Sequence, residues 1–442
     1  MPMPPPLYVD LRIDPTWIIP VEPENALLAG HAVLIDAGRI LDILPQAEAD
    51  ARYQARTHRR LPDHALIPGL INLHTHAAMT LLRGYADDLP LMTWLQEHIW
   101  PAERRWVSRE FVLDGTRLAC LEMLEGGITC FNDMYFFPEA AVQAATEAGQ
   151  RMAAGIIVID FPSNYAADVD GYLEKGLALR DAMRNEPLVS FCMAPHAPYS
   201  TSDRSLEKIL VYAKQLDLPI HIHVHETHEE IRQGIEEYGV RPLERLRHLG
   251  LLGPDFIAVH AVHLLDEEVQ LLAEHGCHVA HCPTSNLKLA SGIAPKASLL
   301  AKGVNVGIGT DGPASNNRLD CWQEMRLAAL LAKGMSGRPE IVPARHALRM
   351  ATLSGARALG LEERIGSIEV GKQADLVAVD LSGPHTQPCF DPVSQLVYCA
   401  GREDVTQVWV AGREVVRDGR CVTLDEAEIL GNAQIWRQRL KA

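Results

Sequence analysis

Short apolar runs alternate with longer amphipathic stretches through the middle of the chain. Stretches such as "REFVLDGTRLACLEMLEGG" and "DEEVQLLAEHG" place apolar residues at the three- and four-residue spacing of a helix with one buried face. Between them lie eight apolar runs, each short enough for one buried strand, at residues 66–73, 128–134, 152–159, 188–194, 219–225, 256–260, 278–282 and 304–309. Successive strand–helix units of this number predict a (β/α)8 barrel of the TIM type.

The two ends of the chain have a different pattern, in which short β-branched runs are separated by glycine turns. Near the N-terminus, "HAVLIDAGRILDIL" has the turn "DAGR" between two apolar runs, as a hairpin does. Near the C-terminus, "GSIEVGKQADLVAVDL" and "VTQVWVAGREVVRDGR" look similar. We therefore expect residues 1–63 and 365–442 to build one small flanking β-sandwich domain, with a terminal helix, and residues 64–364 to form the barrel.

Composition narrows the class of protein. Hydrophobic residues make up 47% of the chain and charged residues 22%, as in soluble globular proteins. The formal net charge of −16 argues against phosphate backbones and anionic membranes, so we expect neither nucleic acid nor a membrane as a partner. The nine cysteines form no CxxC pair, and the N-terminus has no signal-peptide pattern, which together indicate reduced thiols in a cytoplasmic protein.

Five of the predicted strands end in ionisable or metal-binding side chains. The active sites of TIM barrels lie at the C-terminal ends of the strands, so these residues are candidates for a shared site. They are His74 with His76, His196, the group His221, His223 and His225 with Glu226, His260, and Asp311.

His74 and His76 are two residues apart, so in a strand both imidazoles point to the same side. With one histidine of the fifth strand and the carboxylate of Asp311, they make a set of three nitrogens and one oxygen. Such a set suits zinc with a position left for water, and zinc can lower the pKa of that water to about 7. We expect Glu226 to turn its carboxylate toward the same mouth and to shuttle protons.

Spacing alone leaves several roles open. The three histidines of the fifth strand share one face, so periodicity cannot choose the ligand among them. A lone buried histidine is more often a hydrogen-bonded core residue than a ligand, and isolated charges such as Glu103 are often solvated. The residues without an assigned role on these grounds are His221, His225, His263, His281 and Lys288.

The motifs together resemble those of the amidohydrolase superfamily over nearly the whole chain. "PGLINLHTH" is similar to its first-strand metal motif, "HIHVHET" to its fifth-strand H-x-x-E motif, and "AVHAVHL" and "GTDGPASNN" to its sixth- and eighth-strand segments. The resemblance implies His223 as the third histidine ligand and Glu226 as the acid–base. Members with two metals bridge them with a modified lysine on the fourth strand. Here "LVSFCMAPHAP" has no lysine, which implies one zinc ion per subunit and the deaminase branch.

Within that superfamily, "TLLRGYADDLPLMTWLQEHIWPAE" resembles the lid segment of the 5-methylthioadenosine/S-adenosylhomocysteine deaminase family. The resemblance implies that Glu103 contacts the ribose hydroxyls and that His196 contacts the base side of a nucleoside. Trp94, Trp100 and Leu81 would form a lid that excludes water. Some members grip a carboxylate tail with arginines near the end of the third strand. Residues 155–176 contain none, which favours methylthioadenosine as substrate over S-adenosylhomocysteine.

The same resemblance implies a reaction in which hydroxide attacks C6 of the adenine ring. Asp311 would accept the proton of the water, Glu226 would deliver a proton to ring N1, and His260 would orient the attacking oxygen. We also expect a homo-oligomer. Two alternatives stay open: another aminated heterocycle of the guanine or triazine type as substrate, and a non-catalytic scaffold. Retention of all four ligands and of Glu226 argues against the scaffold.

Overall fold

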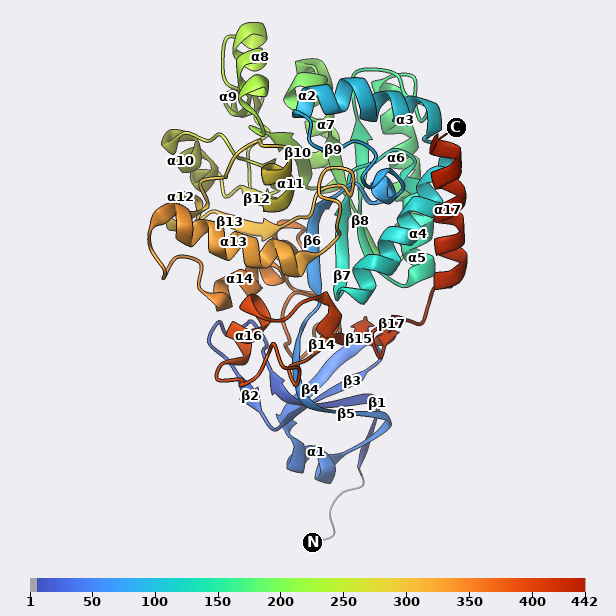
Figure 1. Ribbon diagram of the computed structural model, residues 1–442, viewed down its shortest axis with the longest axis vertical. Coiled ribbons are helices and arrows are strands. Elements are labelled where there is room, and N and C mark those ends of the chain that lie inside the picture. Colours follow the sequence, from blue (N-terminus) through green and yellow to red (C-terminus); the bar gives the residue numbers. More distant parts are fainter. Residues whose placement is uncertain (1–5, 442) are drawn as a thin grey trace.

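The computed structural model describes residues 6–441, which form a parallel barrel above a separate mixed sheet (Figure 1). The eight barrel strands pair in chain order: β6 (Leu70–Thr75), β7 (Ile128–Asp133), β8 (Arg151–Val158), β9 (Val189–Pro195), β10 (Ile220–Val224), β11 (Phe256–His260), β12 (His278–His281) and β13 (Asn305–Ile308). The ends of the sheet meet where the backbone N–H of Asp311 donates to the carbonyl oxygen of His74 over 3.0 Å. The predicted TIM-type barrel is confirmed.

Helices after the strands form the outer layer of the barrel. They are α4 (Arg109–Glu125), α5 (Pro138–Ala148), α6 (Val169–Met183), α7 (Asp203–Leu216), α8 (His228–Tyr238), α9 (Pro242–His248), α10 (Asp266–Glu274), α11 (Pro283–Lys288), α12 (Lys296–Ala301), α13 (Cys321–Ser336), α14 (Ala344–Met350) and α15 (Leu353–Ala358), with the short turn η3 (Pro198–Ser200) after β9. Five of these helices begin where a side-chain oxygen accepts a hydrogen bond from the first turn, which stabilises the helix start. The capping residues are Ser108, Asp168, Ser202, Thr227 and Asp320.

A lid segment lies between β6 and α4, at the C-terminal ends of the barrel strands. It consists of η1 (Ala77–Leu82), α2 (Leu91–Thr93), η2 (Trp94–Ile99) and α3 (Trp100–Trp106). In Figure 1 its helices α2 and α3 lie across the top of the barrel, on the side opposite the flanking sheet. The lid thus stands over the rim at which the candidate residues were expected.

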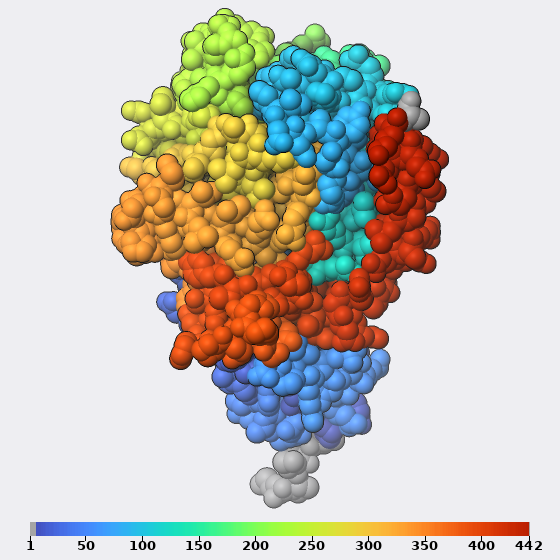
Figure 2. Space-filling model, in the orientation of Figure 1, coloured from blue at the N-terminus to red at the C-terminus, as the bar shows by residue number. Residues whose placement is uncertain are grey.

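The flanking sheet is built from both ends of the chain, as expected, and in Figure 2 the blue and red segments meet in the lower half of the molecule. Its strands are β1 (Leu7–Ile18), β2 (Leu28–Ala29), β3 (His31–Asp36), β4 (Arg39–Pro45), β5 (Tyr53–Pro68), β14 (Leu376–Asp380), β15 (Val405–Val410), β16 (Arg413–Arg417) and β17 (Arg420–Cys421), with α1 (Gln46–Arg52), α16 (Pro392–Tyr398) and η4 (Arg402–Asp404) between strands. β5 joins the two halves, because it pairs with β1 on one side and with β14 on the other. The division at residues 63 and 64 stays a prediction, and β5 runs through it.

The flanking sheet curls on itself around a core. Val33 and Ile35 of β3 share one hydrophobic cluster with Leu376 and Trp409, although several strands separate them in the sheet. The turn between β3 and β4 contacts the turn between β15 and β16, since a Cβ atom on Gly38 would lie 2.5 Å from the carbonyl oxygen of Ala411. Only glycine fits this approach, and its φ of 76° also favours glycine.

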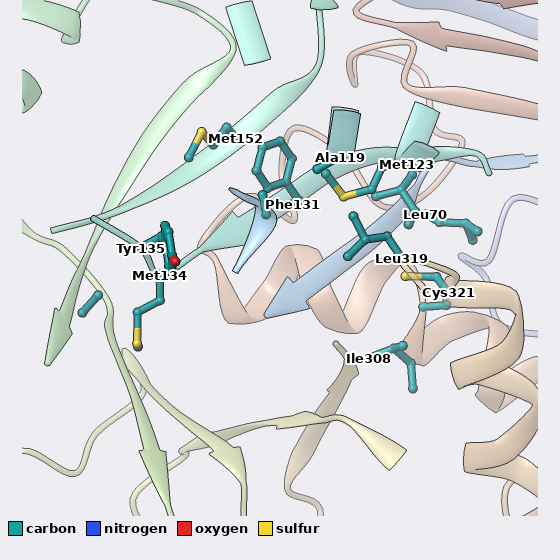
Figure 3. Close-up of a cluster of buried hydrophobic side chains, with 14 of the residues drawn as sticks. Leu70, Ala119, Met123, Phe131, Met134, Tyr135, Met152, Ile308, Leu319 and Cys321 are labelled. Atoms are coloured by element: carbon teal, nitrogen blue, oxygen red, sulfur yellow. The ribbon is translucent and has the colours of Figure 1, made fainter. Parts of the chain in front are cut away.

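The barrel helices pack against the strands through large apolar side chains. Figure 3 shows Phe131 of β7 beside Ala119 and Met123 of α4, with Leu70 of β6 close by. All four are fully buried, and truncating a buried phenylalanine such as Phe131 to alanine costs about 3–5 kcal/mol in similar cores. This packing fixes the positions of β6 and β7, whose ends carry candidate residues.

The terminal helix α17 (Glu426–Lys441) packs on the outside of α4. The indole N–H of Trp436 donates to Asp114 over 2.9 Å, and the ring meets Phe111 edge to face. Among residues 6–441, no helix combines the length and the apolar character that crossing a membrane requires.

Candidate active site

Imidazole and carboxylate groups converge at the ends of β6, β10 and β13. Nε2 of His74 lies 3.2 Å from Nε2 of His223, and Oδ1 of Asp311 lies 3.3 Å from Nε2 of both His74 and His76. Tetrahedral zinc with bonds of about 2.0–2.1 Å would hold its ligand atoms about 3.3–3.4 Å apart. These three separations, between imidazole nitrogens and a carboxylate oxygen, therefore match those between ligand atoms on one zinc ion.

Hydrogen bonds behind the imidazoles fix which nitrogen faces the centre. Nδ1 of His76 donates to the carbonyl oxygen of Met134, and Nδ1 of His223 donates to that of His196, each over 2.6 Å. A carbonyl can only accept, so both rings carry their proton on Nδ1 and present a lone pair at Nε2. Such outer contacts orient metal-binding histidines and raise their basicity.

His221 lies behind His74 and not at the centre. Its Nε2 is 3.0 Å from Nδ1 of His74. Burial lowers the pKa of His74 to about 3 and that of His221 well below its ordinary value, so both rings are neutral. His221 therefore orients His74 from the outside.

His225 turns away from the centre altogether. Its φ is 55°, which ends the strand, and its Nε2 accepts a hydrogen bond from the backbone N–H of Leu243 over 3.0 Å. Its Nδ1 lies 3.5 Å from a carboxylate oxygen of Glu268. Of the three histidines that periodicity could not separate, His223 is the one whose Nε2 lies beside Nε2 of His74, at 3.2 Å.

Asp311 is held from two sides. The hydroxyls of Ser285 and Ser315 both donate to Oδ2 over 2.6 Å, and the backbone N–H of Gly312 donates to Oδ1 over 2.7 Å. Its φ of 62° is left-handed, a conformation that a non-glycine residue adopts only where the surroundings impose it. The carboxylate is thereby fixed with Oδ1 toward the imidazoles.

Glu226 lies beside these groups at the end of β10. Its carboxylate is 3.7 Å from Nε2 of His260, whose Nδ1 donates to the side-chain oxygen of Asn286 over 2.8 Å. The buried side chain of Glu230 accepts from the backbone N–H of Glu226 over 2.8 Å and so fixes its backbone. Burial raises the pKa of Glu226 to about 7, which suits a group that must both give and take a proton near neutral pH.

The lid and the barrel enclose a cavity that reaches the donor set. Its deep end is lined by His76, His223, Glu226, His260 and Asp311, and its walls include Trp94, Trp100, Glu103, Tyr135 and His196. The hydroxyl of Tyr135 donates to Oε1 of Glu103 over 2.7 Å. Nδ1 of His196 is 2.8 Å from Oγ of Ser200. All predicted catalytic, substrate-binding and metal-binding residues except His74 thus line this cavity, and His74 lies directly beside His223 and Asp311. Leu81 is not among the lining residues.

Residues 65–415 match the Amidohydrolase family. The chain belongs to this family. A 5-methylthioadenosine/S-adenosylhomocysteine deaminase of Teredinibacter turnerae is 49% identical, over 98% of both chains. The solved structure of an adenosine deaminase from Xanthomonas campestris with bound zinc has a TM-score of 0.97 and 48% identity, over 99% of this chain and 100% of that one. An atrazine chlorohydrolase of Arthrobacter aurescens complexed with zinc has a TM-score of 0.90 and 25% identity, over 96% and 99% of the two chains.

Sequence reasoning missed the residues of this amidohydrolase that support the site. The supporting side chains are those of Tyr135, Glu230, Ser285, Asn286 and Ser315. Each lies within seven residues of the end of a barrel strand, so its position in the loop after a strand is the pattern that could have pointed to it.

Lys288 and Glu103 are not the solvated charges that spacing suggests. Nζ of Lys288 donates to Oδ1 of Asp87 in the lid over 2.6 Å and to the carbonyl oxygen of Ala314 over 3.3 Å. Lys288 therefore connects the lid, through Asp87, to the loop after β13 that carries Asp311, through Ala314. Glu103 faces the cavity and is bound by Tyr135.

His263 and His281 lie outside the cavity. Nε2 of His263 donates to the carbonyl oxygen of Ser291 over 2.7 Å. His281 is buried, and neither ring nitrogen has a hydrogen-bond partner in the described part of the chain.

Proposed function

We propose that this amidohydrolase is a zinc-dependent hydrolytic deaminase that converts 5′-methylthioadenosine to its inosine analogue and ammonia. The observation that carries the proposal is the chain of donor atoms in which Nε2 of His74 lies 3.2 Å from His223 and Oδ1 of Asp311 lies 3.3 Å from both His74 and His76, near the carboxylate of Glu226. The sequence and structural likeness to deaminases supports the same reaction class.

One zinc ion per subunit would be held by these four residues. When bound, zinc lowers the pKa of a water molecule to about 7 and supplies hydroxide at neutral pH. The Nδ1 contacts of the histidines and the serine contacts of Asp311 keep the ligand atoms in place before the ion arrives.

Side chains next to the attacking water would accept and donate the protons that the reaction transfers. Asp311 would accept the proton lost by the attacking water. Glu226, whose pKa of about 7 keeps part of the population protonated at neutral pH, would donate to ring N1 and later assist the loss of ammonia. His260, held at Nδ1 by Asn286, would present Nε2 to the attacking oxygen.

The cavity wall supports a nucleoside as substrate. Glu103 lies on the wall between the donor set and solvent, where its carboxylate could accept hydrogen bonds from the 2′- and 3′-hydroxyls of ribose. His196 would contact the base. Trp94, Trp100 and Phe161 give the remaining wall an apolar character that suits a methylthio group.

The protein would work as a cytoplasmic homo-oligomer without nucleic acid or membrane as partner. The nine cysteines of the chain are all free thiols, six of them buried, which supports a reducing compartment.

A screen for ammonia release tests the proposal. Purified zinc-loaded protein is assayed with adenosine, 5′-methylthioadenosine, S-adenosylhomocysteine, guanine and a triazine. We expect the highest kcat/KM with an adenine nucleoside. Highest turnover of guanine or the triazine would replace the substrate assignment, and no turnover of any substrate by zinc-loaded protein would favour the scaffold alternative.

A further inference from the structure

A buried carboxylate lies behind the donor set, on the helix that follows β13. Glu324 of α13 is completely buried and does not line the cavity. A buried charge is costly unless other groups compensate it. Two neutral N–H donors bind this one. The backbone N–H of Thr284 donates to Oε2 over 3.0 Å, and the side-chain amide of Asn316 donates to Oε1 over 2.8 Å. Glu324 therefore joins α11 to the loop after β13.

Both donors lie next to a serine that binds Asp311. Thr284 precedes Ser285 in α11. Asn316 follows Ser315 in the loop after β13. The hydroxyls of the two serines donate to the same oxygen, Oδ2 of Asp311, each over 2.6 Å. One buried carboxylate thus fixes the two segments whose serines hold the other carboxylate.

The amide of Asn316 also reaches the backbone beside Asp311. Its Nδ2 donates to the carbonyl oxygen of Thr310 over 2.7 Å as well as to Glu324. A side-chain amide has its donors on nitrogen and its acceptor on oxygen, whereas a carboxylate and a carbonyl only accept. Glu324 and the Thr310 carbonyl therefore select one orientation of the Asn316 amide. This orientation fastens the residue that directly precedes Asp311.

We propose that Glu324 is a positioning residue for the metal ligand Asp311 and acts through Ser285 and Ser315. The inference rests on the proposed function, because it concerns the zinc that Asp311 would help to hold. With both serines in place, Oδ2 of Asp311 is fixed by two donors and Oδ1 faces the imidazoles of β6 at 3.3 Å. Without Glu324, the two segments would be free to move apart. The Asp311 carboxylate would then gain freedom that zinc binding must remove.

The zinc affinity of Glu324→Gln tests this role. Glutamine keeps the size of the side chain, but its amide offers one oxygen and one NH2 group, so it cannot accept from both Thr284 and Asn316. Mutating residues that orient metal ligands costs about 10–100-fold in metal affinity. Because Glu324 acts from further out, we expect a fall of about 10-fold in competition with a chromogenic chelator.

The matched control is Asp320→Asn, in the same helix. Asp320 is a buried acid that caps the start of α13, and asparagine removes its charge but can keep the cap. Zinc affinity should not change in this variant. Unchanged zinc affinity in Glu324→Gln, or an equal fall in Asp320→Asn, would overturn the assignment.

A double-mutant cycle separates positioning from general support of the fold. In protein that carries both Ser285→Ala and Ser315→Ala, Glu324→Gln should change zinc affinity about twofold or less, because the groups through which it acts are gone. A further fall of about 10-fold in that background would mean that Glu324 does not act through the serines, against the proposal. If Glu324→Gln does not fold, Asn316→Ala removes one of the two hydrogen bonds and should lower zinc affinity by part of the same factor. Unchanged affinity there would also contradict the proposal.

Zinc affinity is measured without substrate, so this test does not depend on turnover. If wild-type protein binds one zinc ion but deaminates no nucleoside, the proposed function fails, yet a fall in zinc affinity in Glu324→Gln still supports the positioning role. If deamination proceeds and Glu324→Gln binds zinc as wild type does, only the role of Glu324 fails.

Discussion

The hydroxyl of Tyr135 donates a hydrogen bond of 2.7 Å to Glu103 and so joins the end of β7 to the lid helix α3. Burial raises the pKa of Glu103 to about 7, while the bond from Tyr135 favours the charged carboxylate. The charge of a group that faces the cavity therefore changes in the neutral pH range.

The pH dependence of kcat/KM should show this ionisation. Only the charged carboxylate can accept from both ribose hydroxyls, so the ratio of kcat/KM for 5′-methylthioadenosine to that for its 2′,3′-dideoxy analogue should rise as the pH increases through about 7, because the ionisation of Glu226 affects both substrates alike. Tyr135→Phe removes a donor that favours the charge, which raises the pKa of Glu103 and should move the rise to higher pH. A 2′,3′-dideoxy nucleoside, which has no hydroxyls for Glu103, is the control substrate. A rise at the same pH in wild type and variant would contradict this coupling.

Glu103→Gln should act through the sugar. A hydrogen bond to a charged group is worth about 1.5–3 kcal/mol, so kcat/KM for the ribose substrate should fall about 10–100-fold. The loss should be small with the 2′,3′-dideoxy analogue. Removing the Glu103 charge and removing the ribose hydroxyls should therefore have strongly non-additive effects on kcat/KM. Glu97→Gln, an exposed acid of the same lid that does not line the cavity, is the matched control. Additive losses would show that Glu103 does not contact the hydroxyls.

Glu226→Gln should separate chemistry from metal binding. The amide keeps the shape of the side chain but cannot shuttle protons, so kcat should fall about 10²–10⁴-fold. Zinc content should stay at one ion per chain, since Glu226 is not among the four proposed ligands. Glu229→Gln, which changes an exposed partner of Arg232, serves as the control. Near-normal turnover in Glu226→Gln would remove this residue from the mechanism.

His221 and His223 should differ in their effect on zinc. His223→Ala removes a proposed ligand, and we expect the protein to lose its zinc on dialysis against a mild chelator. His221→Ala removes only the partner of His74 at 3.0 Å, and zinc affinity should fall about 10–100-fold without loss of the site. Metal analysis and competition with a chromogenic chelator measure both. Equal retention of zinc by the two variants would show that His223 is not a ligand.

The barrel could be predicted from the sequence because its strands are short apolar runs separated by amphipathic helices. The same periodicity brought His74 and His76 to one face. It could not choose among His221, His223 and His225, because the choice depends on depth along the barrel axis and on where the strand ends. The strand ends at Val224, and the left-handed φ of His225 turns that side chain away.

The lid was the harder part to predict. Glu103 and Lys288 look like surface charges because their role depends on what the lid packs against, and no local pattern encodes that packing. Glu103 and Glu226 reach the same cavity from segments far apart in the chain. For such residues the spacing along the sequence carries no information about the distance in space.

The pairing of β5 with β14, in which Pro68 lies opposite Leu376, has a consequence for synthesis on the ribosome. The N-terminal strands leave the exit tunnel before the whole barrel, and β14 leaves after it. Until then β5 exposes a row of unsatisfied backbone donors and acceptors, the kind of edge at which nascent chains associate. Completion of the flanking sheet is thus a late, long-range event, and a translation product truncated before residue 376 would keep this open edge.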